Sequence, residues 1–170
     1  DGTSQKYQNG CTYYTFQQSS TMAMINMEFQ QRLQTHDPNQ IQMHIRNYPF
    51  HPQGLWRMSK IYNATGQHDA SAMLLRRCIY VHECGFHASF LKAAQQGLAR
   101  MDYEGDGNDD HGSDKYEANQ NFFHSLYDHA VIASRRGCRR SSLEIMKLIY
   151  QLDIRDPMGI MLQYDRYCLK

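Results

Sequence analysis

Residues 52–84 read PQGLWRMSKIYNATGQHDASAMLLRRCIYVHEC, and this stretch decides the fold. Apolar side chains recur every three or four positions on both sides of Gly66, which predicts two helices that each bury one stripe. A glycine ends a helix readily because it enters the left-handed conformation at little cost. The residues with the spacing of a tetratricopeptide-type (TPR-type) helix pair are Leu55, Met58, Ser59, Tyr62, Gly66, Ser71, Leu75 and Cys78.

A second unit of helix, glycine and helix surrounds Gly137. When Gly137 is aligned with Gly66, three positions of the following helices correspond: Ser71 with Ser142, Leu75 with Met146, and Cys78 with Ile149. The pattern predicts an all-α fold of stacked antiparallel helix pairs, a TPR-like α-solenoid. Surfaces of this kind generally bind proteins. An irregular helical bundle is the alternative.

Capping and turn residues set the remaining boundaries. Asp37-Pro38 and Asp156-Pro157 each predict a helix start. Further helices are expected over residues 19–34, with Met24 and Met27 on the buried face, and over residues 88–103 and 118–137. Residues 12–16 favour an extended segment. The expected organisation is a polar N-terminal segment, 1–18, and a helical-repeat domain, 19–170, truncated at its C-terminus and interrupted by an acidic mobile loop, 104–117.

Composition narrows the class of protein. The chain has 18 basic and 17 acidic side chains, so its overall charge gives no case for nucleic acid or an anionic membrane. No apolar run approaches the ~20 residues of a membrane span. The five cysteines are widely spaced and include no C-x-x-C motif, which fits a reducing compartment.

Two motifs imitate metal sites. The segment from His82 to His87 resembles the H-E-x-x-H zinc signature, but a spacing of five puts the imidazoles on different helix faces. Packing of Phe86 on Phe90, with His87 satisfying backbone groups, is the simpler interpretation. The segment that starts at Asp102 imitates a calcium-binding loop, yet its twelfth position is Ser113 instead of glutamate. No catalytic, cofactor or metal site is therefore predicted.

Four arginines, Arg135, Arg136, Arg139 and Arg140, surround the turn at Gly137. They are candidates for binding an acidic partner segment or RNA phosphates. Two structural roles compete with partner binding, namely a favourable interaction with a helix C-terminus and pairing with the acidic loop. No aromatic side chains interleave the cluster, which disfavours sequence-specific RNA recognition. Trp56 lies beside the buried stripe and is a candidate anchor for a partner.

Short motifs occur in a fixed order along the chain: Asp37-Pro38-Asn39, Pro49-Phe50-His51, Cys84-Gly85-Phe86-His87, Arg100-Met101-Asp102-Tyr103 and Arg136-Gly137-Cys138-Arg139-Arg140. In this order they resemble the D-P-N, P-Y-H, C-A-F-H, R-L-D-Y and R-G-C-P-R segments of the transcription factor 25 family, which includes subunit 1 of the ribosome quality control complex. The resemblance runs from about residue 6 to the end. Two departures stand out: an acidic stretch replaces the family's R-R-P-E-N-R segment, and Arg139 replaces its proline.

The resemblance implies a non-enzymatic scaffold of ribosome-associated quality control. Such a scaffold would help an E3 ubiquitin ligase act on the nascent chains of stalled 60S subunits. It would be cytoplasmic and ribosome-associated, with no cofactor and no membrane. The older family name implies an alternative, a nuclear transcriptional regulator that binds other proteins.

Overall fold

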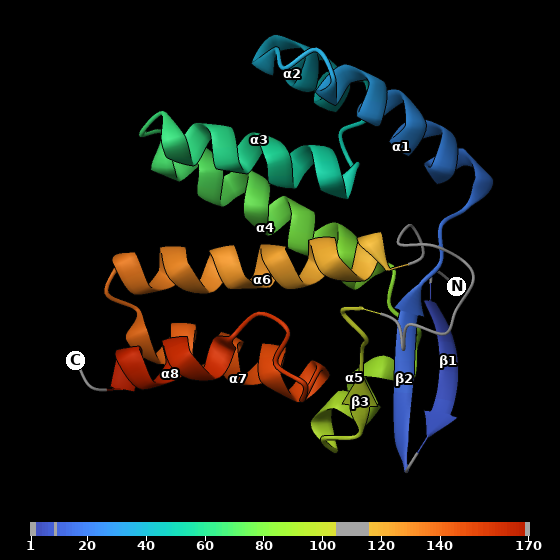
Figure 1. Ribbon diagram of the computed structural model, residues 1–170, viewed down its shortest axis with the longest axis vertical. Helices are drawn as coiled ribbons and strands as arrows, with labels where there is room; N and C mark the ends of the chain where they lie inside the picture. Colours follow the sequence, from blue (N-terminus) through green and yellow to red (C-terminus); the bar gives the residue numbers. More distant parts are fainter. Residues whose placement is uncertain (1–2, 9, 105–115, 169–170) are drawn as a thin grey trace. The chain divides into compact units, whose positions relative to one another are not determined.

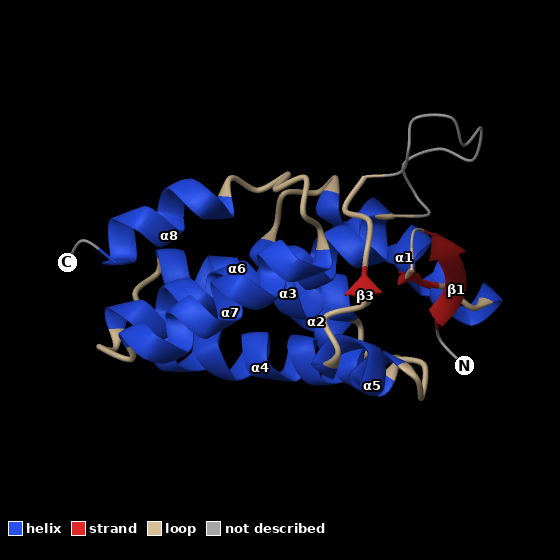
Figure 2. Ribbon diagram, turned by 90° about the horizontal axis from the view of Figure 1, so that it is seen from below, coloured by secondary structure: helices blue, strands red, loops and turns tan. Residues whose placement is uncertain are grey.

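The computed structural model describes residues 3–8, 10–104 and 116–168 (Figure 1). Most of this part of the chain is helical (Figure 2). It forms two compact units. We call Gln18–Gly85 the helical unit, and Asp1–Gln17 with Phe86–Lys170 the mixed unit. Each is described by itself.

The helical unit contains four helices: α1, Ser20–Leu33; α2, Pro38–Asn47; α3, Pro52–Ala64; and α4, His68–Cys84. The helix starts expected near residue 19 and at Asp37-Pro38 are confirmed. Ser19 Oγ accepts a hydrogen bond from the backbone N–H of Met22, and the Asp37 carboxylate accepts one from Asn39 N–H. Helix α2 ends before Pro49, which disfavours helical dihedrals in the residue that precedes it.

Helices α3 and α4 pack against each other through the predicted stripes. Leu55 and Leu75 are fully buried. The Ser71 hydroxyl donates to the carbonyl of Ser59 over 2.8 Å, a contact that small residues permit. Gly66 separates the two helices with φ of 79°, the left-handed conformation expected of it.

In the part of the mixed unit that the structure describes, a small sheet is combined with four helices. Its strands are β1, Thr3–Gln8; β2, Cys11–Phe16; and β3, Ala99–Arg100. They pair in the order β1-β2-β3, antiparallel between β1 and β2 and parallel between β2 and β3, where Thr12 lies opposite Ala99. The helices are α5, Phe90–Gln95; α6, Glu117–Arg135; α7, Arg139–Leu152; and α8, Ile160–Cys168.

The helix expected over residues 88–103 is wrong in its second half. Helix α5 ends at Gln95, and Gly97 has a left-handed φ of 71°. The carbonyl of Leu98 then accepts the N–H of Thr12, and Met101 N–H donates to the carbonyl of Leu152. Because these partners are distant in sequence, helical periodicity gave no sign of them. The chain is therefore mostly helical with a small sheet, instead of all-α.

Aromatic rings join the sheet to the helices in the core of the mixed unit. The rings of Phe86 and Phe90 stack with centroids 3.9 Å apart, as predicted. Phe16 at the end of β2 contacts both Phe86 and Phe122. Helices α6 and α7 pack side by side (Figure 1). The three matched positions, Ser142, Met146 and Ile149, are buried there, as Ser71, Leu75 and Cys78 are in α4.

Two other expectations are wrong. Met24 and Met27 are not buried, since 73% and 67% of their surfaces are exposed, and Phe29 is instead the buried residue of α1. The last helix begins at Ile160 and not at Pro157. Asp156 adopts a left-handed φ of 53°, and its carboxylate accepts hydrogen bonds from the N–H groups of Ile160 and Met161. Asp156 therefore still caps the helix, but from four residues away.

Within the described part of the chain, no helix is both long and apolar enough to cross a lipid bilayer.

Candidate functional site

The turn between α6 and α7 brings the four predicted arginines together. Helix α6 ends at Arg135, Gly137 turns the chain with φ of 83°, and α7 begins at Arg139. All four residues, Arg135, Arg136, Arg139 and Arg140, are exposed. We call this set the arginine turn.

The helix macrodipole favours the positions of two of the four arginines and disfavours those of the other two. Arg135 and Arg136 lie at the C-terminus of α6, where the macrodipole favours cations. Arg139 and Arg140 occupy the first turn of α7, where the positive end of the dipole disfavours them. Cys138, the N-cap, provides no side-chain hydrogen bond to this turn. The macrodipole therefore does not explain the placement of Arg139 and Arg140.

The other structural role suggested for these arginines was pairing with the acidic loop. Residues 105–115 lie outside the described residues, so this pairing stays a prediction. The carboxylate of Glu144 interacts electrostatically with the arginine turn. The pKa of Glu144 is lowered, chiefly by the hydrogen bond from Lys147 and to a lesser degree by the positive charge of Arg140.

Trp56 belongs to the helical unit, on α3, and is half-buried rather than exposed. The Arg57 guanidinium lies 4.9 Å from the centroid of its ring, and the Lys60 ammonium lies 5.6 Å away. Both cations are placed to interact with the π-face of the indole. The aromatic candidate is therefore a cation-flanked tryptophan.

The two motifs that imitate metal sites have structural partners. His82 is buried on α4, and His87 Nδ1 accepts the backbone N–H of Ser89, as the simpler interpretation predicted. Asp102 pairs with Arg155 over 2.9 Å, and most of the calcium-like loop lies outside the described residues. Across residues 3–8, 10–104 and 116–168, no group of three or more His, Cys, Asp or Glu side chains is arranged to hold a metal ion.

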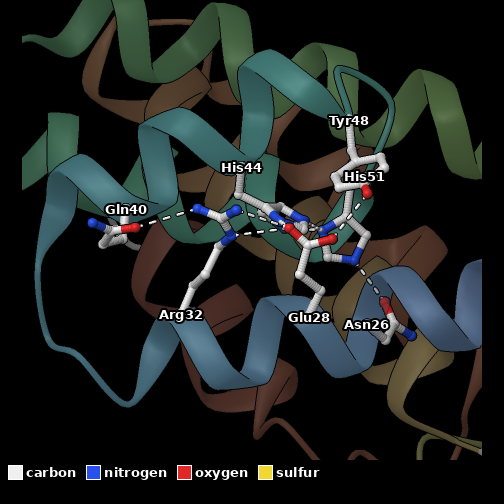
Figure 3. Close-up of polar contacts among 8 residues, drawn as sticks. Asn26, Glu28, Arg32, Gln40, His44, Tyr48 and His51 are labelled. Carbon is white, nitrogen blue, oxygen red and sulfur yellow. Dashed lines mark hydrogen bonds and ion pairs between the residues drawn. The ribbon is translucent and has the colours of Figure 1, made fainter.

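Sequence reasoning missed a polar cluster in the helical unit, which Figure 3 shows. We call it the histidine cluster; its members are Asn26, Glu28, Arg32, Gln40, His44, Tyr48 and His51. His44 is fully buried and His51 is 2% exposed. Both imidazoles pack against Phe29, each with a ring centroid 4.9 Å from that of Phe29.

The backbone fixes the protons of the two histidines. Gly54 N–H donates to His51 Nδ1 over 3.3 Å, so that nitrogen carries no proton. His44 Nε2 lies 3.0 Å from the same nitrogen and must therefore be the donor. His51 Nε2–H then donates to Asn26 Oδ1 over 2.6 Å. Both histidines are neutral, and together they link α1, α2 and the start of α3.

Glu28 organises the outer half of the histidine cluster. Its carboxylate accepts hydrogen bonds from the Tyr48 hydroxyl and the Arg32 guanidinium, each over 2.9 Å. These bonds lower the pKa of Glu28 and keep it ionised. Within the described residues His44 Nδ1 has no hydrogen-bond partner, and it lies 4.0 Å from Glu28 Oε1.

Burial lowers the pKa of His44 and lowers that of His51 to about 3. Unfolding therefore takes up protons below the ordinary histidine pKa of about 6.5. We expect the free energy of unfolding of the helical unit to be nearly constant above pH 7 and to fall between pH 7 and pH 5, by about 2 kcal/mol from His51 and by a further amount from His44. Glu28 titrates below this window because its pKa is lowered. Urea unfolding followed by Trp56 fluorescence measures the change, and equal stability at both pH values would contradict it.

The histidine cluster serves to fix the corner of α1, α2 and α3. The hydrogen bonds of its two imidazoles are made to each other, to Asn26 and to the backbone N–H of Gly54, and none is made to a hydroxyl or thiol that could act as a nucleophile. Only one hint of this cluster was present in the sequence, the His51-Pro52 pair before α3. A histidine next to a helix-starting proline is a weak signal by itself, and the partner side chains are set by the packing of α1 on α2.

The family model described as "Transcriptional repressor TCF25" matches residues 14–170. The chain belongs to the TCF25 family. The resemblance expected from the short motifs is thereby confirmed.

Several relatives in the TCF25 family carry names from ribosome quality control. The chain is 28% identical over 158 residues to "Ribosome quality control complex subunit 1" of Schizosaccharomyces pombe, covering 93% of this chain and 22% of that protein. It is 26% identical over 162 residues to the human "Ribosome quality control complex subunit TCF25", covering 95% and 22%. It is also 25% identical over 159 residues to "Probable transcription factor claV" of Ampulloclitocybe clavipes, covering 93% and 19%.

The chain thus spans about a fifth of the length of these relatives. Their names describe complex subunits or transcription factors and not enzymes. No solved structure gives a significant match.

Proposed function

We propose that this chain is a non-enzymatic helical scaffold of ribosome-associated quality control. In this role it helps an E3 ubiquitin ligase act on nascent chains of stalled 60S subunits. The observation that carries the proposal is membership of a family whose relatives are named as subunits of the ribosome quality control complex. A cytoplasmic, ribosome-associated location follows from the same role.

The scaffold would be a TPR-like solenoid of antiparallel helix pairs. In α3–α4, Ser59 contacts Ser71 while Pro52 contacts Cys78. Residue numbers fall along one helix as they rise along the other, which supports antiparallel packing. The buried triplet of Ser142, Met146 and Ile149 supports a second pair, α6–α7, of the same kind.

The arginine turn is the proposed partner contact in the mixed unit. Arg139 and Arg140 oppose the dipole of α7, and a residue kept against helix stability is a candidate for function. Arginine suits carboxylates and phosphates because its planar fork binds either with two hydrogen bonds. Trp56 is the proposed anchor in the helical unit, where its indole lies against two cations.

The complex is tested by affinity purification of the full-length protein with mass spectrometry. We expect ribosomal proteins of the 60S subunit together with an E3 ubiquitin ligase. Recovery of neither would overturn the proposal. Enrichment of nuclear transcription complexes would instead support the alternative, a transcriptional regulator, which the family description and the claV relative favour.

The contact is tested with a variant in which Arg139 and Arg140 are replaced by Gln. We expect co-sedimentation with 60S subunits to weaken about tenfold at moderate salt, because two phosphate or carboxylate contacts are lost. In a matched control variant, two exposed lysines of the same unit, Lys92 and Lys147, are replaced by Gln. This variant should co-sediment with 60S subunits as the parent protein does. The arginine changes relieve an unfavourable interaction with the dipole of α7, so helix electrostatics give no reason to expect that they destabilise it. Equal binding by both variants would remove the arginine turn from the interface.

A further inference from the structure

A groove of about 330 Å³ lies among α2, α3 and α4 of the helical unit. Its floor consists of apolar side chains that belong to or pack on the core: Ile45, Met58, Tyr62 and Leu74. Its rim carries two arginines, Arg46 from α2 and Arg77 from α4. Among the described residues, none of the side chains that line this α2–α4 groove is acidic. The groove therefore combines an apolar floor with two positive charges.

Two exposed methionines lie on the same helix faces as the arginines of the groove. Met73 lies one helical turn before Arg77, and Met43 lies three residues before Arg46, so each shares a helix face with its arginine. They are 71% and 51% exposed. Flexible methionine side chains adapt to the shape of a ligand and are common at binding surfaces.

Arg77 is held in place by Phe50. The guanidinium lies 4.8 Å from the centroid of the Phe50 ring, which is itself 58% exposed. A cation over an aromatic face loses part of its freedom before any ligand arrives. Less entropy is then lost when a carboxylate binds to it, which favours binding.

We propose that the α2–α4 groove docks a peptide segment in which apolar side chains are flanked by glutamates or aspartates. The apolar side chains fill the floor over Met58 and Leu74, and the carboxylates pair with Arg46 and Arg77. The volume is at the lower end of the ~300–1,000 Å³ typical of ligand sites, which suits one or two side chains. A nucleic-acid backbone supplies the charge but no apolar group for the floor, so an acidic peptide fits better than RNA.

This inference goes beyond the scaffold role and does not depend on it. The groove and its charges are the same whether the protein acts on ribosomes or in the nucleus. Failure to recover 60S subunits would therefore leave the groove proposal intact, and loss of peptide binding would leave the ribosomal proposal intact.

The probe is a fluorescein-labelled peptide in which a central Leu-Leu pair is flanked by glutamates, titrated with the 170-residue chain and followed by fluorescence anisotropy. We expect the variant with both Arg46→Glu and Arg77→Glu to bind about tenfold more weakly, because two attractions become repulsions. The matched variant, Arg76→Glu with Lys92→Glu, makes the same charge change on exposed cations outside the groove and should bind within about twofold of the parent. A peptide with glutamine in place of glutamate should bind weakly to all three proteins.

The place of binding is read from the methyl resonances of the methionines. Met58 on the floor and Met43 and Met73 beside the rim should shift when the acidic peptide is added. Met24 and Met27, exposed on α1 in the same unit, should not. Equal binding by the two charge variants, shifts confined to Met24 and Met27, or no binding of the acidic peptide would each overturn the proposal. An RNA oligonucleotide that outcompetes the peptide through Arg46 and Arg77 would also overturn it.

Discussion

Replacing His51 with Ala is expected to lower the free energy of unfolding of the helical unit by about 4 kcal/mol. The imidazole is 2% exposed and uses both of its nitrogens. Its removal takes the hydrogen-bond partner from two buried donors, His44 Nε2–H and Gly54 N–H, and from the half-buried Asn26 Oδ1. It also opens a cavity against Phe29, because the site can collapse only in part.

The site leaves little room for compensation. A Cβ atom on Gly54 would lie 3.1 Å from His51 Nδ1 and 3.5 Å from His44 Cδ2, so the backbone already approaches both rings closely. His51 is also the N-cap of α3, and its loss uncaps the helix that carries Leu55 and Met58. Packing, hydrogen bonding and capping thus fail together.

Urea unfolding followed by fluorescence isolates this effect, since Trp56 is the only tryptophan of the chain and lies on α3. The control is His68→Ala, which removes an exposed histidine of the same unit that contacts Asn63. It should change stability by about 0.5 kcal/mol or less. If both variants unfold at the same urea concentration, the histidine cluster does not stabilise the corner.

Most helix boundaries of the fold could be predicted from capping residues, prolines and glycines that act on their neighbours in sequence. Asp37-Pro38 defines the start of α2 through chemistry that involves only the next few residues. Gly66 and Gly137 define helix ends, because their positive φ is available to glycine without strain. These features depend on neighbours in sequence, so the sequence alone was sufficient to predict them.

Features that depend on distant partners were missed. Strand β3 forms because residues 99–100 pair with β2. The sequence around Ala99 contains no signal that predicts this pairing. Met24 and Met27 follow a helical period, yet the buried residue of α1 is Phe29, since the side chains of α2 and α3 determine which face is covered.

Among the candidate sites too, the sequence predicted the one formed by neighbouring residues and missed those formed by distant ones. The arginine turn is nearly contiguous in sequence, so a charge cluster around Gly137 predicted it directly. The histidine cluster and the α2–α4 groove each join side chains from three helices, and Arg46 and Arg77 meet at the groove only after the chain has folded. A sequence pattern along one helix does not show which side chains will share a surface with another.

Replacing Asn119 with Ala is expected to have the second large effect on stability, this time in the mixed unit. Its side chain is fully buried at the start of α6. Its Oδ1 accepts the N–H of Phe16 over 3.1 Å, and its Nδ2 donates to the carbonyl of Asp102 over 2.8 Å. One amide therefore satisfies the end of β2 and the segment that follows β3. Asn119→Ala is expected to destabilise the mixed unit by about 3 kcal/mol, because it breaks hydrogen bonds to the buried N–H of Phe16 and the half-buried carbonyl of Asp102.

Amide hydrogen exchange separates local from unit-wide loss. The Phe16 amide should exchange faster in the variant simply because its acceptor is gone. The Met101 amide donates to Leu152 and not to Asn119, so it exchanges faster only if the whole unit opens more often. We expect its exchange to accelerate roughly a hundredfold, the equivalent of about 3 kcal/mol.

The control for Asn119 is Gln120→Ala, which removes a half-buried amide side chain from the next position of the same helix. It should leave the exchange of Met101 nearly unchanged. If Met101 stays protected in Asn119→Ala, the unit does not depend on this amide to hold the sheet against α6. Accelerated exchange in that variant alone would show that one buried side chain joins the end of β2 and the segment after β3 to α6.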